Sequence, residues 1–129
     1  MLLNHLNLCV SDVLAQCDLF ARHFDFRVEQ RANEGALLYG PDGFFLVLTK
    51  IGSEVHTYPS SPPFNFHVGF MVESEAQVLA KHQELDAAGR QPGPVKRYQA
   101  LGADWVAFYC PIGDGIDIEV NTHTPHAAR

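Results

Sequence analysis

The chain has 129 residues, of which 47% are hydrophobic, so it is long enough for one compact domain and too short for two ordinary ones. Its formal charge of -6 and its pI near 5.5 argue against nucleic acid or an anionic membrane as the partner, because a polyanion would be repelled over most of the surface. A small-molecule substrate is the expected partner.

The start of the chain and its cysteine content indicate the cellular compartment that we expect for the protein. The first ten residues contain no basic leader followed by a long apolar run, and no segment approaches the roughly 20 apolar residues that span a bilayer. The three cysteines are odd in number and show no CxxC spacing, which is typical of reduced thiols rather than of a disulfide framework. We therefore expect a cytoplasmic protein without a membrane segment.

The first half of the chain predicts a strand, a helix and three further strands. Residues 5–10 alternate, with His5, Asn7 and Cys9 on one face and Leu6, Leu8 and Val10 on the other. Ser11 or Asp12 then caps a helix whose apolar residues recur at helical spacing: Val13, Cys17, Phe20 and Phe24. Runs of strand character follow at 26–32, 35–40 and 44–50, with the turn Pro41-Asp42-Gly43 before the last.

The second half repeats this order after a linker at about 51–63 that is rich in turn formers. Residues 64–72 alternate, with His67 on one face and an apolar set on the other: Phe64, Phe66, Val68, Phe70 and Val72. Ser74 and Gln77 have capping-box spacing, and Gly89 is a natural helix stop for a helix lined by Val78, His82 and Leu85. Strand character returns at 93–99, 104–110 and 115–120.

Each half therefore reads as a βαβββ module, and the fold class is α+β. We place module 1 at about 3–50, module 2 at about 64–121 and a frayed tail at 122–129, in one domain that spans 1–129. A unit this small cannot bury both sides of its sheet, so two copies must combine, within the chain or between chains. Paired curved sheets would enclose a cleft.

Three polar residues share the non-apolar faces of these strands. In the last strand the apolar face is formed by Ile116, Ile118 and Val120. Glu119 therefore lies on the opposite, polar face, as His5 and His67 do in their strands. A lone strand histidine is more often solvent-facing or hydrogen-bonded than a ligand, but the repetition favours a shared role. Two neutral imidazoles and a carboxylate suit a divalent metal, and three ligands leave positions open for substrate or oxygen.

The segments "HLNLCVSD", "FHVGFMV" and "AFYCPIGDGIDIEV" resemble the vicinal oxygen chelate superfamily, which includes glyoxalase I, extradiol dioxygenases, fosfomycin-resistance proteins and bleomycin-binding proteins. The resemblance covers the chain from about Leu3 to Val120. It implies paired modules in an open eight-stranded barrel, a homodimer with exchanged modules, and one divalent metal, either Fe, Mn, Ni or Zn. The metal-ligand positions of the fosfomycin-resistance and extradiol members match His5, His67 and Glu119 in order and strand context.

Departures from the family pattern bear on the reaction. Glyoxalase I has a fourth protein ligand near the end of the first module, at the position equivalent to Glu119. Glu119 lies four residues after the turn glycine Gly115, and the residue four after the turn glycine Gly43 is Val47. Because Val47 carries no carboxylate, the ordinary glyoxalase site is not expected. Tyr109 resembles the tyrosine of extradiol dioxygenases that contacts the substrate hydroxyl, although Ala100 stands where those enzymes carry a supporting histidine. Ring cleavage with Tyr109 as the catalytic residue is therefore placed first among the reactions, and a packed strand tyrosine is the alternative.

Three other functions stay open. A glyoxalase-like isomerase or lyase would need another base. A fosfomycin-type transferase would need cations around the phosphonate, which Lys96 and Arg97 could supply. The alternative is that these two residues belong to a solvated turn. A non-catalytic binder of the bleomycin-resistance type could line a groove with Phe64, Phe66, Trp105 and Tyr109. Two histidines and a glutamate aimed into a cleft would cost a hydrophobic binder free energy, which favours a metal-dependent enzyme.

Overall fold

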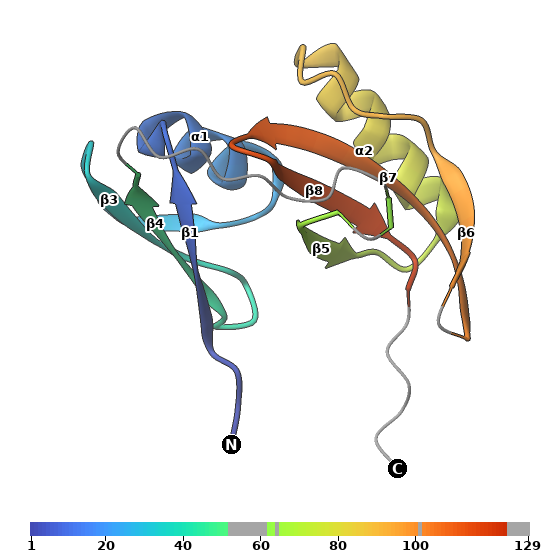
Figure 1. Cartoon of the computed structure of the whole chain (residues 1–129), viewed down its shortest axis with the longest axis horizontal. Coiled ribbons are helices and arrows are strands. Elements are labelled where there is room, and N and C mark those ends of the chain that lie inside the picture. Colours follow the sequence, from blue (N-terminus) through green and yellow to red (C-terminus); the bar gives the residue numbers. More distant parts are fainter. Residues whose placement is uncertain (52–61, 64, 101, 124–129) are drawn as a thin grey trace. The chain divides into compact units, whose positions relative to one another are not determined.

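The computed structural model describes residues 1–51, 62–63, 65–100 and 102–123 (Figure 1). The chain divides into two compact units, Met1–Val55 and His56–Arg129, and each carries one helix and four strands. Within the described ranges, no helix has both the length and the apolar character needed to cross a membrane. The α+β class and the two predicted βαβββ modules are confirmed.

Unit 1 contains β1 (His5–Val10), α1 (Val13–His23), β2 (Arg27–Arg31), β3 (Gly35–Tyr39) and β4 (Phe45–Lys50). Its sheet has the order β1-β4-β3-β2, in which β1 pairs with β4 in parallel and the other pairs are antiparallel. Asp12 is the N-cap of α1, because its side chain accepts a hydrogen bond from the backbone N–H of Ala15 at 3.0 Å. The sequence had left Ser11 and Asp12 as alternatives.

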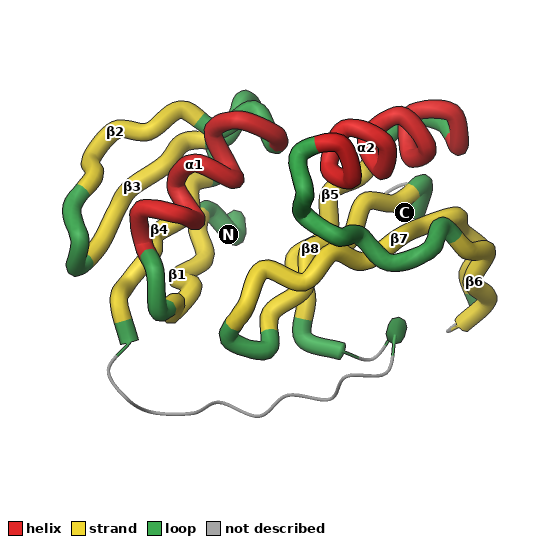
Figure 2. Tube along the Cα trace, turned by 90° about the horizontal axis from the view of Figure 1, so that it is seen from above, coloured by secondary structure: helices red, strands yellow, loops and turns green. Residues whose placement is uncertain are grey.

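The core of unit 1 lies between α1 and one face of the sheet (Figure 2). The predicted apolar parities supply it, with Leu8, Val10, Leu38, Leu46 and Leu48 buried in the sheet and Val13, Cys17 and Phe20 buried in the helix. Full burial of one such aliphatic side chain contributes about 1.5–3 kcal/mol. Leu6 differs from the prediction, because it is 37% exposed near the start of the edge strand β1.

Unit 2 contains β5 (His67–Met71), α2 (Glu75–Ala87), β6 (Lys96–Ala100), β7 (Ala103–Gly113) and β8 (Ile116–Asn121). The sheet order β5-β8-β7-β6 repeats that of unit 1, again with one parallel pair, β5 with β8. The capping box of Ser74 and Gln77 is present at the start of α2. Gly89 follows the helix with a φ of 75°, a conformation that glycine adopts without steric cost.

The core of unit 2 is formed by α2 and the apolar parities of β7 and β8. Val78 and Leu85 of the helix are buried, as are Val106, Phe108, Ile116, Ile118 and Val120 of the strands. His82, which was expected on this helix face, is half-buried, packs its ring edge-on against Phe108 and lies 2.9 Å from the carbonyl oxygen of Gly93 through Nε2. Phe66 differs from the prediction, since it lies just before the edge strand β5 and is 36% exposed.

The strand registers show how closely the two units correspond. In unit 1, His5 lies opposite Phe45 and Asn7 lies opposite Val47. In unit 2, His67 lies opposite Asp117 and Gly69 lies opposite Glu119. Since His5 corresponds to His67, Val47 occupies in unit 1 the place that Glu119 occupies in unit 2.

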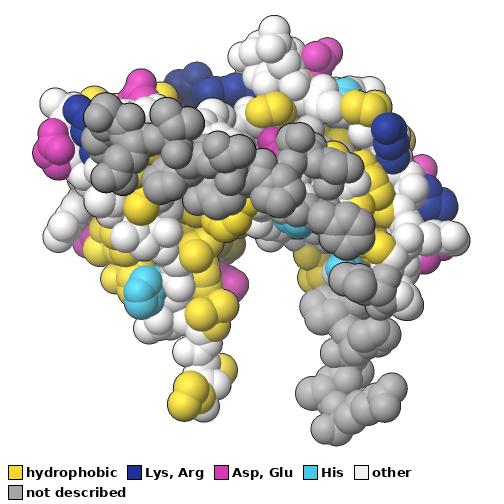
Figure 3. All heavy atoms as spheres, in the orientation of Figure 1, with side chains coloured by type: hydrophobic (Ala, Val, Ile, Leu, Met, Phe, Trp, Pro, Cys, Tyr) yellow, Lys and Arg dark blue, Asp and Glu magenta, His cyan; other side chains and the backbone are white. Residues whose placement is uncertain are grey.

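The strands pair in two four-stranded sheets rather than in one closed barrel. The open arrangement of both sheets and the exchanged dimer stay predictions. The predicted linker falls mostly outside the described residues, as do Phe64 and residues 124–129 of the tail. On the face seen in Figure 3, Lys and Arg side chains are scattered among Asp and Glu side chains. The hydrophobic residues Met1, Leu2 and Leu3 at the N-terminus are exposed.

Candidate metal centre

Two of the three predicted ligands meet on the sheet face of unit 2 that lies opposite α2. His67 begins β5, and Glu119 lies in the neighbouring strand β8, between the core residues Ile118 and Val120. Nε2 of His67 is 2.9 Å from Oε2 of Glu119. Glu119 is only 5% exposed, so its carboxylate depends on nearby groups to compensate for lost hydration.

The other ring nitrogen of His67 is already engaged. Nδ1 lies 2.7 Å from the backbone carbonyl oxygen of Asn65, and a carbonyl only accepts, so Nδ1 carries the proton in this contact. In the neutral imidazole, Nε2 then presents a lone pair to a carboxylate, which is also an acceptor. A proton on Nε2 resolves this conflict, and a metal cation that both groups bound would resolve it too. The hydrogen bond with Glu119 accordingly raises the pKa of His67 above its ordinary value.

The spacing of this pair suits a metal ion. Ligand atoms at about 2.1 Å from an octahedral or similar cation lie about 3 Å apart when they occupy adjacent positions. The 2.9 Å between Nε2 and Oε2 matches that separation. The separation of the two atoms is therefore compatible with adjacent ligands of one divalent cation, and equally with a hydrogen bond between them.

Asn65, to which the sequence analysis assigned no role, forms hydrogen bonds that hold this pair in place. It is buried, and besides its carbonyl contact with His67 its side-chain amide donates to Oδ2 of Asp117, the residue opposite His67 in β8. Asp117, which is half-buried, therefore has a hydrogen-bond partner beside the site. The hydrogen bond from a metal-binding histidine to such an acceptor fixes the ring orientation and its tautomer.

Tyr109 lies on the same face, opposite Glu119 in the register of β7 and β8. Its ring packs edge-on against the His67 ring, with centroids 5.2 Å apart and an interplanar angle of 82°. The hydroxyl is buried and has no hydrogen-bond partner within the described part of the chain. Burial, followed by the charge of Glu119, raises the pKa of Tyr109, so the hydroxyl stays protonated and is a potential donor.

Gly69 leaves space beside the carboxylate. A Cβ at this position would lie 3.2 Å from Nδ2 of Asn121 and 4.0 Å from Oε2 of Glu119. The first separation is tighter than an ordinary van der Waals contact, so any larger side chain would crowd the Glu119 side of the centre. The absence of a side chain here keeps that side open.

His5, the third predicted ligand, belongs to unit 1 and is exposed. Its ring stacks on Phe45 with centroids 4.8 Å apart and an angle of 8°. Nδ1 lies 2.7 Å from Oδ1 of Asn4, so this histidine too has its Nδ1 held by an oxygen and keeps Nε2 for coordination. Across the described residues, His, Cys, Asp and Glu form no group of three that could hold a metal ion; the structure brings together His67 and Glu119.

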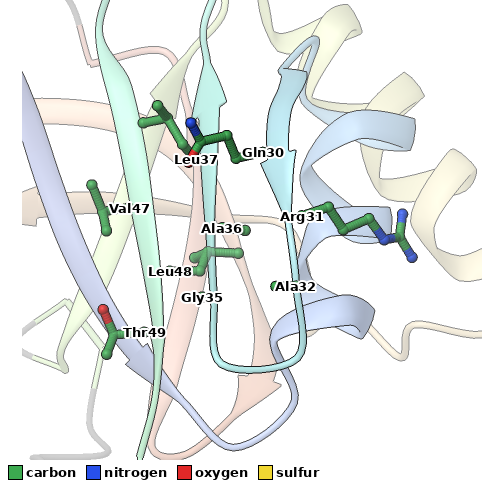
Figure 4. A pocket seen from close by; sticks show the side chains of 9 residues that line it. All are labelled: Gln30, Arg31, Ala32, Gly35, Ala36, Leu37, Val47, Leu48 and Thr49. Carbon is green, nitrogen blue, oxygen red and sulfur yellow. The ribbon is translucent and has the colours of Figure 1, made fainter.

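In unit 1 the counterpart of Glu119 is the aliphatic residue Val47. There a pocket of about 440 Å³ lies over β2, β3 and β4, with Gln30, Leu37, Val47 and Thr49 among its lining residues (Figure 4). Leu37 lies opposite Val47 as Tyr109 lies opposite Glu119. Both units therefore have the same strand register and each keeps a histidine, His5 or His67, but Val47 and Leu37 stand in unit 1 where Glu119 and Tyr109 stand in unit 2.

The two cations of β6 point in different directions. Arg97 bonds to Asp104 at 3.1 Å and to Glu75 of α2 at 3.5 Å, which places it on the helix face. Lys96 is the neighbouring residue, and alternation puts it on the opposite face, that of Tyr109. Of the two residues that were considered as a source of positive charge, Arg97 is thus committed elsewhere.

Comparisons with known proteins show the family and the fold. The model of the family Glyoxalase/Bleomycin resistance protein/Dioxygenase superfamily matches residues 2–120. A possible glyoxalase from Bacillus cereus is 37% identical, with a TM-score of 0.74, and the match covers 93% of this chain and 97% of that one. No curated protein matches the sequence.

Two further solved structures share the fold at lower identity. A glyoxalase/bleomycin resistance protein/dioxygenase from Nocardioides is 18% identical over 98% of this chain and 86% of its own, with a TM-score of 0.71. A domain of the same description from Frankia sp. EAN1pec is 21% identical over 96% of this chain and 98% of its own, with a TM-score of 0.68.

Proposed function

The chain belongs to the glyoxalase/bleomycin resistance protein/dioxygenase superfamily, and from this premise we propose that it is a divalent-metal-dependent enzyme. Its substrate is a small molecule that binds the metal through two neighbouring oxygens. The observation that carries the proposal is the contact of His67 with Glu119, in which Nε2 and a carboxylate oxygen face each other at 2.9 Å.

In this proposal Nε2 of His67, Nε2 of His5 and the carboxylate of Glu119 hold the metal. When bound, Fe, Mn, Ni or Zn supplies Lewis-acid polarisation of the substrate oxygens, and iron or manganese also supplies oxygen chemistry. The protein's own part is to fix the ligands. Nδ1 of His67 contacts the carbonyl oxygen of Asn65, and Nδ1 of His5 contacts Oδ1 of Asn4. In each histidine Nε2 is therefore left for the metal.

Cleavage of a catechol-like ring is the first reaction to test. Tyr109 lies against His67 and opposite Glu119, and its raised pKa keeps it a donor that can orient a substrate hydroxyl. Val47 in the place corresponding to Glu119 removes the fourth carboxylate that a glyoxalase I site needs. Both observations support oxygen chemistry over the ordinary glyoxalase reaction.

A glyoxalase-like isomerase or lyase is the second candidate, and the 37% identity to a possible glyoxalase favours it. A fosfomycin-type transferase has less support, because Arg97 pairs with Glu75 and Asp104 and leaves Lys96 on the site face. A binder of the bleomycin-resistance type would have no use for the His67–Glu119 pair. We further propose a cytoplasmic homodimer in which both modules form an open barrel, with His5 supplied by the same chain or by its partner.

Oxygen uptake and product formation test the reaction. Protein loaded anaerobically with Fe(II) or Mn(II) is given catechols, and protein loaded with Ni(II) or Zn(II) is given a hemithioacetal of glutathione. We expect oxygen consumption with a catechol, and its loss in Glu119→Gln but not in Glu84→Gln, an exposed glutamate of α2. Isomerisation of the hemithioacetal without oxygen uptake would instead support the second candidate.

A further inference from the structure

Tyr98 lies on the same sheet face as the candidate metal centre. In β6 it lies opposite Trp105 of β7, and its ring meets the ring of Tyr109 at 5.7 Å and 88°. Strand alternation places Lys96 on this face as well, whereas Arg97 points to α2. Tyr98 and Lys96 therefore form one edge of the face that carries His67 and Glu119.

The ring of Tyr98 is held in place by aromatic contacts. It stacks on Trp105 with centroids 5.8 Å apart and an angle of 20°. Trp105 is buried, and its ring also stacks on the ring of His123, with centroids 5.1 Å apart and an interplanar angle of 17°. These contacts hold the ring of Tyr98 in place, so the position of its hydroxyl oxygen is set before a ligand arrives.

The hydroxyls of Tyr98 and Tyr109 differ in accessibility. Tyr109 is buried and its hydroxyl is enclosed, whereas Tyr98 is half-buried and its hydroxyl is not among the enclosed polar atoms. No hydrogen bond to the Tyr98 hydroxyl occurs among the residues that the structure describes. Burial, and then the charge of Glu119, raises the pKa of Tyr98, so it remains a donor.

Lys96 adds a positive charge to this edge. It is exposed, and within the described ranges it forms no ion pair, although Arg97 beside it is paired twice. The other ionisable groups on this face of unit 2 include the acids Asp117 and Glu119. An ammonium group on the same sheet face as a hydroxyl donor is suited to a carboxylate on the ligand.

We propose that Tyr98 and Lys96 determine specificity by binding a carboxylate that the substrate carries in addition to its two metal-binding oxygens. Tyr98 donates a hydrogen bond to this carboxylate, and Lys96 supplies the counter-charge. The substrate class is then a small vicinal diol or related oxygen chelator with a carboxylate substituent. This inference rests on the proposed metal-dependent function.

Trp105, the single tryptophan of the chain, stacks on Tyr98 and reports directly on ligands at this edge. Its fluorescence is followed while protein loaded with redox-inert Zn(II) is titrated with 3,4-dihydroxybenzoate or with catechol, which lacks the carboxylate. Wild type should bind the carboxylate compound more tightly. Tyr98→Phe keeps the ring, and it should weaken that binding about tenfold while catechol binding changes less than about twofold.

Lys96→Ala should also weaken binding of the carboxylate compound, and its remaining affinity should depend less on salt than that of wild type. Tyr39→Phe, at a half-buried tyrosine of the unit 1 sheet, is the control and should bind both compounds as wild type does. Equal loss of both compounds in Tyr98→Phe would overturn the proposal, because Tyr98 would then support the metal centre itself. No loss of either compound would overturn it too.

Metal content separates this result from the proposed function. Tyr98→Phe and Lys96→Ala should hold as much Zn(II) as wild type. If wild type binds no metal, the proposed function fails and the specificity assignment fails with it. If all three proteins bind metal and do not differ toward the two compounds, only the specificity assignment fails.

Discussion

Nε2 of His67 lies 2.9 Å from Oε2 of Glu119 although Nδ1 of the same ring already lies against the carbonyl oxygen of Asn65. The arrangement leaves Nε2 to share either a proton or a metal cation with the carboxylate. Because one position serves both, protons and metal compete for it. The candidate centre should therefore lose metal on acidification.

The first prediction concerns the stability of the metal-free protein. The hydrogen bond to Glu119 raises the pKa of His67 in the folded state above its unfolded value. A raised pKa contributes stability that is complete below the unfolded value, near 6.5, and is lost as pH rises through the folded value. Chemical unfolding of metal-free protein from pH 5 to about pH 9 should show this loss.

Glu119→Gln removes the cause of that pH dependence. In this variant the free energy of unfolding should be lower than in wild type by roughly 1–2 kcal/mol below pH 6, and the difference should shrink as pH rises. His82→Gln changes another half-buried histidine of the same unit, and it should leave the wild-type pH dependence in place. A Glu119→Gln protein with an unchanged pH profile would contradict this account of the pair.

The second prediction concerns Gly69. Gly69→Ala places a Cβ 3.2 Å from Nδ2 of Asn121 and 4.0 Å from Oε2 of Glu119, and we expect metal affinity to fall several-fold as the Asn121 side chain shifts. Isothermal titration with Zn(II) measures it. Asn121→Ala in the same chain removes the nearest atom and should restore most of the affinity. Failure of this second substitution to restore binding would show that crowding by Asn121 is not the cause.

The third prediction tests the core of unit 2 with two leucines of one helix. Leu85 is fully buried, and Leu85→Ala should lower the free energy of unfolding by about 2–5 kcal/mol through lost burial and the cavity left behind. Leu79 is 45% exposed, and Leu79→Ala should change it by about 0.5 kcal/mol or less. Similar losses for both variants in chemical denaturation would contradict the assigned packing of α2.

The fourth prediction concerns Val47, the counterpart of Glu119 in unit 1. Val47 is half-buried and lines the unit 1 pocket, so Val47→Glu should destabilise the protein by about 1–3 kcal/mol, whereas Val47→Thr should cost less because it adds no charge. Thermal denaturation compares the two. If Val47→Glu is harmless without metal, the pocket is more hydrated than its lining indicates.

Local sequence patterns were enough to predict both modules. Alternation and caps are short-range signals, so the strand beginning at His5 and the capping box of Ser74 could be found without tertiary information, whereas the first N-cap could be narrowed only to Ser11 or Asp12. Leu6 and Phe66 were assigned to the core by parity alone. Their exposure depends on position at a sheet edge, which alternation does not encode.

The site was predictable in part for the same reason. Parity placed His67 and Glu119 on one face, and the register of β5 with β8 brings them into contact. The sequence pattern does not reveal the roles of Asn65 and Tyr98. Asn65 acts through its backbone carbonyl, which any residue would provide, and Tyr98 is distinguished from Tyr109 only by the burial of the Tyr109 hydroxyl. How His5 completes the centre stays a prediction, as does the catalytic role of Tyr109.

Metal content measured by elemental analysis tests the central claim most directly. The protein is purified without chelator or affinity tag, together with His5→Ala, His67→Ala, Glu119→Ala and the control Glu84→Gln. We predict about one equivalent of iron, manganese, nickel or zinc per chain in wild type and in Glu84→Gln, and its loss in the other three variants with the fold retained by circular dichroism. No metal in wild type, even after anaerobic reconstitution with Fe(II) and Mn(II), would contradict the account and favour a binding protein on the same fold.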